Sequence, residues 1–119
     1  MAAELTGKIW YLVAPIVGVL GTFISGSNTV SNIMFGAFQL NTAYEIGLPV
    51  FSILALQAVG GAAGNMICIH NIVAVLTIVG LLGQEGTVIR KNLPVAFLYA
   101  LLSGALAWAI APLVSKILL

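Results

Sequence analysis

Eight consecutive residues at positions 25–32, Ser-Gly-Ser-Asn-Thr-Val-Ser-Asn, interrupt apolar sequence with side chains that can bind a small polar molecule. Seven of the eight are polar or glycine. A membrane tolerates such a run only where protein covers it or where it lines a wet cavity, because each unpaired backbone group in hydrocarbon costs several kcal/mol. Short hydroxyl, amide and glycine residues also favour caps and turns over helix interiors. The run therefore predicts a helix break inside a membrane, beside a small polar ligand.

A second run of small residues, Gly-Gly-Ala-Ala-Gly-Asn at positions 60–65, interrupts the next apolar segment. Like the first run, it contains three small residues followed by an asparagine. We expect each break to present a helix N-terminus, with free N–H groups and a positive dipole end, near mid-membrane depth. Such ends bind small anions such as carboxylates, and broken helices facing a central site recur in secondary transporters. The alternative is close helix packing through Gly60 and Gly64, and both interpretations can hold together.

The side chains around the two breaks form the predicted substrate site. Asn28, Asn32 and Gln39 share one helical face by their spacing, and the nearby hydroxyls can donate to a carboxylate or a hydroxyl. The structural alternatives are helix capping by Ser27 or Asn28 and interhelical hydrogen bonding by Gln39. The predicted binding residues are Ser25, Gly26, Ser27, Asn28, Thr29, Asn32, Gly61, Gly64 and Asn65.

His70 is the only histidine and, apart from Cys68, the only ionisable residue well inside an apolar segment. Histidine changes charge near neutral pH, so His70 is the best candidate for a proton carrier if transport is coupled to protons. In a regular helix it would point about 140° away from Asn65, and it faces the break only if the backbone unwinds or another segment closes round it. The alternative is a structural histidine bonded to a neighbouring carbonyl. Cys68 is expected to serve packing.

The composition predicts an integral membrane protein. Of the 119 residues, 61% are hydrophobic and 6% are charged, whereas soluble domains carry roughly 25% charged residues. The formal net charge of +1 gives no reason to expect nucleic acid as a partner. The sequence holds no carboxylate pair, metal-ligand cluster or nucleophile–base pair, so we expect neither an enzyme nor a bound metal or cofactor.

The apolar segments predict an all-α integral membrane fold that forms a single unit over residues 1–119. It comprises a helical hairpin at 9–44, a broken helix at 48–82 and a terminal helix at 94–118. Each arm of the hairpin has about 16 residues, or roughly 24 Å of helix, whereas a hydrocarbon core is about 30 Å thick. These lengths favour a re-entrant hairpin; a pair of tilted spanning helices is the alternative.

The motifs around the breaks resemble a known family. The quoted stretches are Gly21-Thr-Phe-Ile-Ser-Gly-Ser-Asn-Thr-Val-Ser-Asn32, Phe35-Gly36, Phe38-Gln39, Gln57-Ala-Val-Gly-Gly-Ala-Ala-Gly-Asn-Met-Ile-Cys-Ile-His-Asn71 and Gly80-Leu-Leu-Gly-Gln-Glu-Gly86. In this order they look like the C-terminal part of the bacterial L-lactate permease family, over roughly residues 12–94. The resemblance implies uptake of lactate, glycolate and similar 2-hydroxymonocarboxylates with a proton, by a multi-pass protein of the cytoplasmic membrane.

The same family is grouped with a wider ion transporter superfamily whose sodium-coupled carboxylate members carry Ser-Asn-Thr at hairpin tips. Ser27-Asn28-Thr29 matches that signature. By this resemblance, residues 9–82 form the substrate-holding half of one inverted repeat. Family members are several times longer than this chain, so the resemblance implies a C-terminal fragment that supplies about half of the substrate site.

Three functional interpretations remain open at this point. The first is proton-coupled transport of a small monocarboxylate in a lipid bilayer, with the other half of the site supplied by the remainder of the transporter or by a homo-oligomer. The second keeps the architecture and couples transport to sodium, bound by Ser27-Asn28-Thr29. The third is a small membrane protein that does not transport, either an accessory subunit or a decayed fragment.

Overall fold

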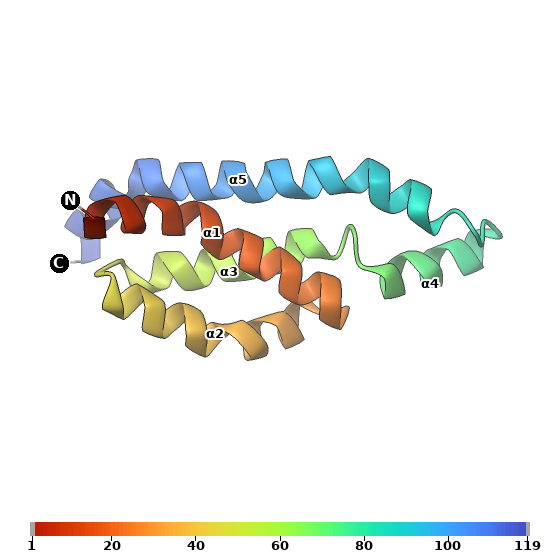
Figure 1. The fold of residues 1–119 in the computed structure, drawn as a ribbon, viewed down its shortest axis with the longest axis horizontal. Helices are drawn as coiled ribbons and strands as arrows, with labels where there is room; N and C mark the ends of the chain where they lie inside the picture. Colours follow the sequence, from red (N-terminus) through yellow and green to blue (C-terminus); the bar gives the residue numbers. More distant parts are fainter. Residues whose placement is uncertain (1, 119) are drawn as a thin grey trace.

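The computed structural model describes residues 2–118 as five helices arranged in an elongated bundle (Figure 1). They are α1 (Ala2–Ser25), α2 (Asn28–Glu45), α3 (Val50–Gly64), α4 (Ile69–Val79) and α5 (Glu85–Leu118). The bundle measures 53 × 26 × 24 Å. In Figure 1, α5 runs along the whole length, α3 and α4 follow one another beside it, and α1 and α2 form a hairpin at one end. The expectation of an all-α fold is confirmed for the described residues.

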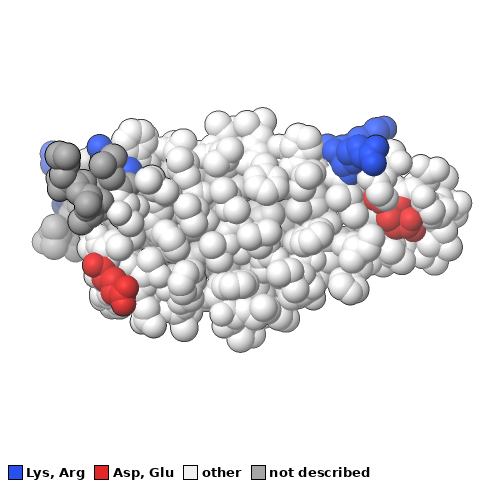
Figure 2. Space-filling view, viewed as in Figure 1, with Lys and Arg blue, Asp and Glu red and all other residues white. Residues whose placement is uncertain are grey.

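Three segments are long and apolar enough to cross a membrane: Thr6–Ser25, Val50–Val79 and Glu85–Ile117. The charged side chains visible in Figure 2 gather at the two ends of the molecule and leave an uncharged body between them. Many large apolar side chains of α4 and α5 are exposed, among them Ile78 and Ile117. This distribution fits a bundle whose middle lies in hydrocarbon and whose ends lie at the two membrane surfaces.

Helix α1 packs against α3 through glycines that remove side chains from the contact. The Cα of Gly60 faces the carbonyl of Pro15, and a Cβ built on Gly64 would lie 2.6 Å from the carbonyl oxygen of Val19. Such close approach of two backbones requires residues without a Cβ. The packing interpretation of Gly60 and Gly64 is therefore confirmed.

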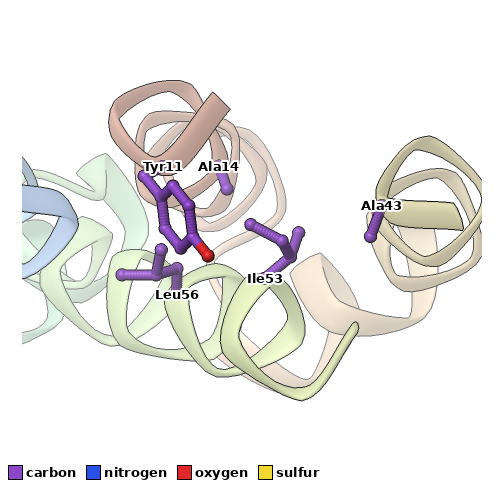
Figure 3. Packing of buried hydrophobic residues seen from close by; sticks show 5 residues of the cluster. All are labelled: Tyr11, Ala14, Ala43, Ile53 and Leu56. Atoms are coloured by element: carbon purple, nitrogen blue, oxygen red, sulfur yellow. The ribbon is translucent and has the colours of Figure 1, made fainter. Parts of the chain in front are cut away.

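Apolar side chains fill the rest of the contact between α1 and α3. Figure 3 shows Tyr11 and Ala14 of α1 next to Ile53 and Leu56 of α3, with Ala43 of α2 at the edge. All five are buried. A second cluster, made of Val19, Ala63, Ile67, Ala96 and Ala100, joins α1 and α3 to α5.

A buried network of amide side chains holds α2 against α1 and α3. Gln39 is fully buried; its Nε2 donates to Gln57 Oε1 at 2.9 Å and to the carbonyl of Ala14 at 3.1 Å. Gln57 Nε2 donates in turn to Ser31 Oγ at 3.1 Å, and Trp10 Nε1 donates to Gln39 Oε1 at 3.1 Å. Gln39 thus makes interhelical hydrogen bonds, the structural role that the sequence offered as an alternative to substrate binding.

Three boundaries differ from those that the sequence indicated. Helix α1 begins at Ala2 rather than at position 9, and its 24 residues exceed the predicted arm of about 16. Residues 60–64 belong to helix α3, and the break follows at positions 65–68, before α4 begins at Ile69. The terminal helix begins at Glu85 rather than at position 94, because Pro94 is accommodated inside α5. The small residues of α3 thus serve helix contact, and the helix ends just after them.

Candidate functional site

The tip of the α1–α2 hairpin meets the break between α3 and α4. A Cβ placed on Gly26 would lie 3.4 Å from Nδ1 of His70 and 3.5 Å from Sγ of Cys68. Gly26 has a φ of +79°, which allows the chain to reverse in a short turn. Figure 1 shows this turn beside the gap between α3 and α4. The two interruptions seen in the sequence therefore lie together in space.

Two helix N-termini point into this meeting place. At the start of α2, the side chain of Ser27 accepts a hydrogen bond from the N–H of Val30 at 3.4 Å, while the N–H groups of Asn28 and Thr29 precede the first intrahelical bond. At the start of α4, Cys68 occupies the cap position and makes no side-chain capping bond. Free N–H groups and the dipole of each helix favour an anion there.

The expectation that Gly64 and Asn65 begin a helix is wrong. Gly64 ends α3 and Asn65 is its C-cap, so this segment presents carbonyl oxygens rather than N–H groups. The free N–H groups of the second break belong to the first turn of α4, which starts at Ile69 and contains His70. The run of small residues indicated where the helix stops, but not how many residues pass before it resumes.

Three side-chain oxygens near the hairpin tip are buried and have no hydrogen-bond partner among the described residues. They belong to Thr22, Asn28 and Asn32. Two of these oxygens pack against Gly61, which has no side chain. A Cβ on Gly61 would collide with Oδ1 of Asn28 and lie 3.3 Å from Oγ1 of Thr22. An unsatisfied buried oxygen costs about 1–3 kcal/mol. A bound hydroxyl, water or cation would remove that cost.

The other predicted residues have more local roles. Ser25 Oγ donates to the carbonyl of Ser27 at 3.0 Å within the tip, and the Ser27 hydroxyl caps α2. The side chain of Thr29 is exposed. Asn65 Oδ1 accepts a hydrogen bond from Asn71 Nδ2 at 3.1 Å. Of the predicted set, the structure places Gly26 next to His70 at the break. It also places the side chain of Asn28 against Gly61 of α3.

His70 lies in the first turn of α4, exposed and next to the hairpin tip. Its Nδ1 is 3.7 Å from Sγ of Cys68, which is fully buried. Both conditions for it to face the break are met, since the backbone unwinds at 65–68 and Gly26 closes against it. Its neighbour is a thiol rather than the carbonyl that a structural histidine was expected to bond.

Three polar residues at or beside the two breaks had no clear signal in the sequence. Thr22 is the lone aliphatic hydroxyl residue within the apolar stretch at positions 9–24 of α1, and that isolation was its only signal. Asn71 bonds Asn65 across the break, and Asn92 Nδ2 donates to the carbonyl of Met66 at 2.9 Å. Asn92 lies inside α5, upstream of the predicted start of the terminal helix at position 94, and binds a carbonyl of the break.

Within the described part of the chain, no three His, Cys, Asp or Glu residues come close enough to hold a metal ion. At the meeting point the described residues offer N–H groups, amides, hydroxyls and one imidazole. Groups of these kinds can form hydrogen bonds with a small polar molecule.

Comparison with known proteins decides the family. The sequence profile described as L-lactate permease matches residues 1–114. The chain belongs to the L-lactate permease family. Members of this family are transporters rather than enzymes, and the three apolar helices make this chain part of a multi-pass membrane protein.

Relatives of this L-lactate permease segment are much longer than the segment itself. It is 46% identical over 111 residues to a Haemophilus influenzae protein named "Putative L-lactate permease", covering 93% of this chain and 21% of the relative. It is 40% identical over 91 residues to an L-lactate permease of Bacillus subtilis, covering 76% and 16%. With a glycolate permease of Escherichia coli it shares 31% over 99 residues, covering 83% and 18%. The chain spans about a fifth of their length, and no solved structure matches it.

Proposed function

We propose that this chain forms about half of the substrate site of a secondary transporter that carries L-lactate and glycolate with protons across the bacterial cytoplasmic membrane. The observation that carries the proposal is the meeting of the hairpin tip with the α3–α4 break, where the start of α2 lies next to the start of α4. Asn28, the first residue of α2, also keeps an amide oxygen that is buried and unpaired among the described residues. The relatives named as L-lactate and glycolate permeases support this choice of substrate class.

The proposed binding mode places each group of a 2-hydroxy acid against a complementary one. The carboxylate accepts hydrogen bonds from the N–H groups of Asn28 and Thr29 and from the first turn of α4 at Ile69–Asn71. The 2-hydroxyl donates to an amide oxygen of Asn28 or Asn32, each of which lacks a donor in the described structure. His70 carries the proton, and its charged form offsets the carboxylate during translocation.

The proposed architecture is a re-entrant hairpin followed by a broken helix. Its tip lies at the break in the middle of the 30-residue apolar segment Val50–Val79, so the hairpin extends only part of the way along that segment. The other half of the site, in an inverted repeat, would come from the remainder of the transporter or from a second copy.

The test uses two glycine substitutions in the complete permease, assayed as lactate uptake into proteoliposomes. Gly61→Ala places a methyl group where Oδ1 of Asn28 lies, so the lactate KM should rise by about tenfold, the loss expected for one displaced hydrogen-bonding group. Gly36→Ala is the matched control, because nothing lies within 4 Å of its added Cβ. If Asn28→Ala and Gly61→Ala both leave uptake equal to the control, the site assignment fails.

One observation favours a second candidate, sodium coupling. Three buried oxygens from Thr22, Asn28 and Asn32 lack donors, and oxygen ligands suit a hard cation. Lactate uptake measured at fixed pH with sodium replaced by an impermeant cation separates the two candidates. Uptake that needs sodium favours this second candidate, and uptake that persists without sodium favours protons.

A further inference from the structure

A cavity lies on the α5 side of the helix break. It has a volume of about 300 Å³ and lies between α4 and α5. Its walls include Asn65, Asn71, Ile72, Val75, Val88 and Asn92. The lining comes from the break, from positions 71–76 of α4 and from the first two turns of α5.

The three asparagines of this cavity are held in place with hydrogen-bonding groups to spare. Asn71 Nδ2 donates to Asn65 Oδ1 at 3.1 Å, and Asn92 Nδ2 donates to the carbonyl of Met66 at 2.9 Å. These bonds leave the Oδ1 atoms of Asn71 and Asn92 as acceptors and the Nδ2 of Asn65 as a donor. One side of the cavity thus offers two acceptors and one donor at fixed positions.

The remaining lining of the cavity is largely aliphatic and includes Ile72, Val75 and Val88. Three amides beside a short aliphatic wall match a small molecule that carries a carboxylate, a hydroxyl and a short alkyl group.

We propose that this cavity is a vestibule site that binds a short 2-hydroxy acid before it reaches the hairpin tip. The hydroxyl of the acid donates to Oδ1 of Asn71 or Asn92, its carboxylate accepts from Nδ2 of Asn65, and its alkyl group lies against Val75 and Val88. The proposal rests on the proposed function for the choice of ligand. It assigns a separate site, because the tip contacts Cys68 and His70, and neither of these lines the cavity.

The test compares two substitutions on α4 in the complete permease, one at Val75 and one at Ile78. Val75 lines the cavity and is 58% exposed, while Ile78 is 84% exposed and does not line it. Val75→Phe fills the cavity and should raise the lactate KM about tenfold, the scale at which a pocket discriminates by size. Ile78→Phe, the matched control, should leave the KM unchanged, and equal membrane levels of both variants show that each folds.

A reverse substitution adds an independent readout. Val75→Ala enlarges the cavity, so uptake of 2-hydroxybutyrate should rise several-fold relative to lactate. If Val75→Phe behaves like Ile78→Phe and Val75→Ala leaves the substrate ratio unchanged, the vestibule site is ruled out while wild-type lactate uptake still supports the proposed function. Absence of lactate uptake by the wild-type permease would instead overturn the proposed function and this inference with it.

Discussion

Asn28 keeps an amide oxygen buried without a donor from the described residues, and Gly61 provides the space for that oxygen. An unpaired buried oxygen costs about 1–3 kcal/mol, and a ligand that donates a hydrogen bond to it recovers this free energy. Gln39 shows the opposite case, since both its amide nitrogen and its oxygen have protein partners. The amide oxygen of Asn28 can thus accept a hydrogen bond from a ligand, whereas the amide of Gln39 holds α2 against α1 and α3.

His70 should separate proton coupling from substrate binding. In the complete permease, His70→Ala should lower lactate accumulation driven by a pH gradient by about tenfold or more, because this segment then lacks its one imidazole. Lactate exchange between equal pH on both sides should stay close to wild type. Thr77→Val, on the same helix, serves as the control; full gradient-driven accumulation by His70→Ala would remove the proposed role.

Helix α3 has two functions at once. Its glycines bring its backbone against α1, and its C-terminal end opens the break that the hairpin tip meets. The amides of Gln39 and Gln57 then lock α2 onto the pair. Helix α5 packs on α1 and α3 as well, whereas α4 makes its contacts chiefly with α5 and is the least tightly packed of the five helices.

Gly60→Ala should destabilise the group formed by α1, α2 and α3. The added methyl group would collide with the carbonyl of Pro15, and overpacking of this kind costs about 1–3 kcal/mol. Thermal unfolding of the detergent-solubilised chain should show a lower midpoint. Gly86→Ala is the matched control, because no atom lies within 4 Å of its Cβ, and its midpoint should not fall. Equal midpoints for the two variants would contradict the close α1–α3 contact.

The whole molecule has its charges at its ends and an uncharged body between them (Figure 2). The last apolar segment, Glu85–Ile117, has 17% of its most apolar stretch buried inside the bundle, so most of that surface is available to lipid or to other parts of a transporter. The relatives are about five times longer. One side of the proposed site is thus presented by this chain, and the facing side is expected from elsewhere.

The isolated 119-residue chain should accordingly not carry lactate. Reconstituted alone in liposomes, it should show lactate flux no greater than empty vesicles, whereas the complete permease should show uptake. Chemical crosslinking in the same vesicles tests for a second copy. Flux by the chain alone together with a crosslinked dimer would show that a homo-oligomer supplies the facing half.

The sequence by itself determined the membrane class, the hairpin turn at Ser25–Asn28 and the existence of a second interruption. These follow from local chemistry: apolar composition, residues that cap helices and residues that permit tight turns. It also indicated Asn28 and His70, because polar side chains in apolar helices are rare enough to stand out.

Only the tertiary structure decided where the second interruption unwinds and which residues of different helices come into contact. Gly60 and Gly64 carry the same local signal whether they unwind a helix or pack it, and α1 had to be in place before packing could be recognised. The same holds for Gln57 and Asn92, whose partners are about 26 residues away in the chain. Periodicity describes neighbours along one helix, whereas a binding site is made where different helices end side by side.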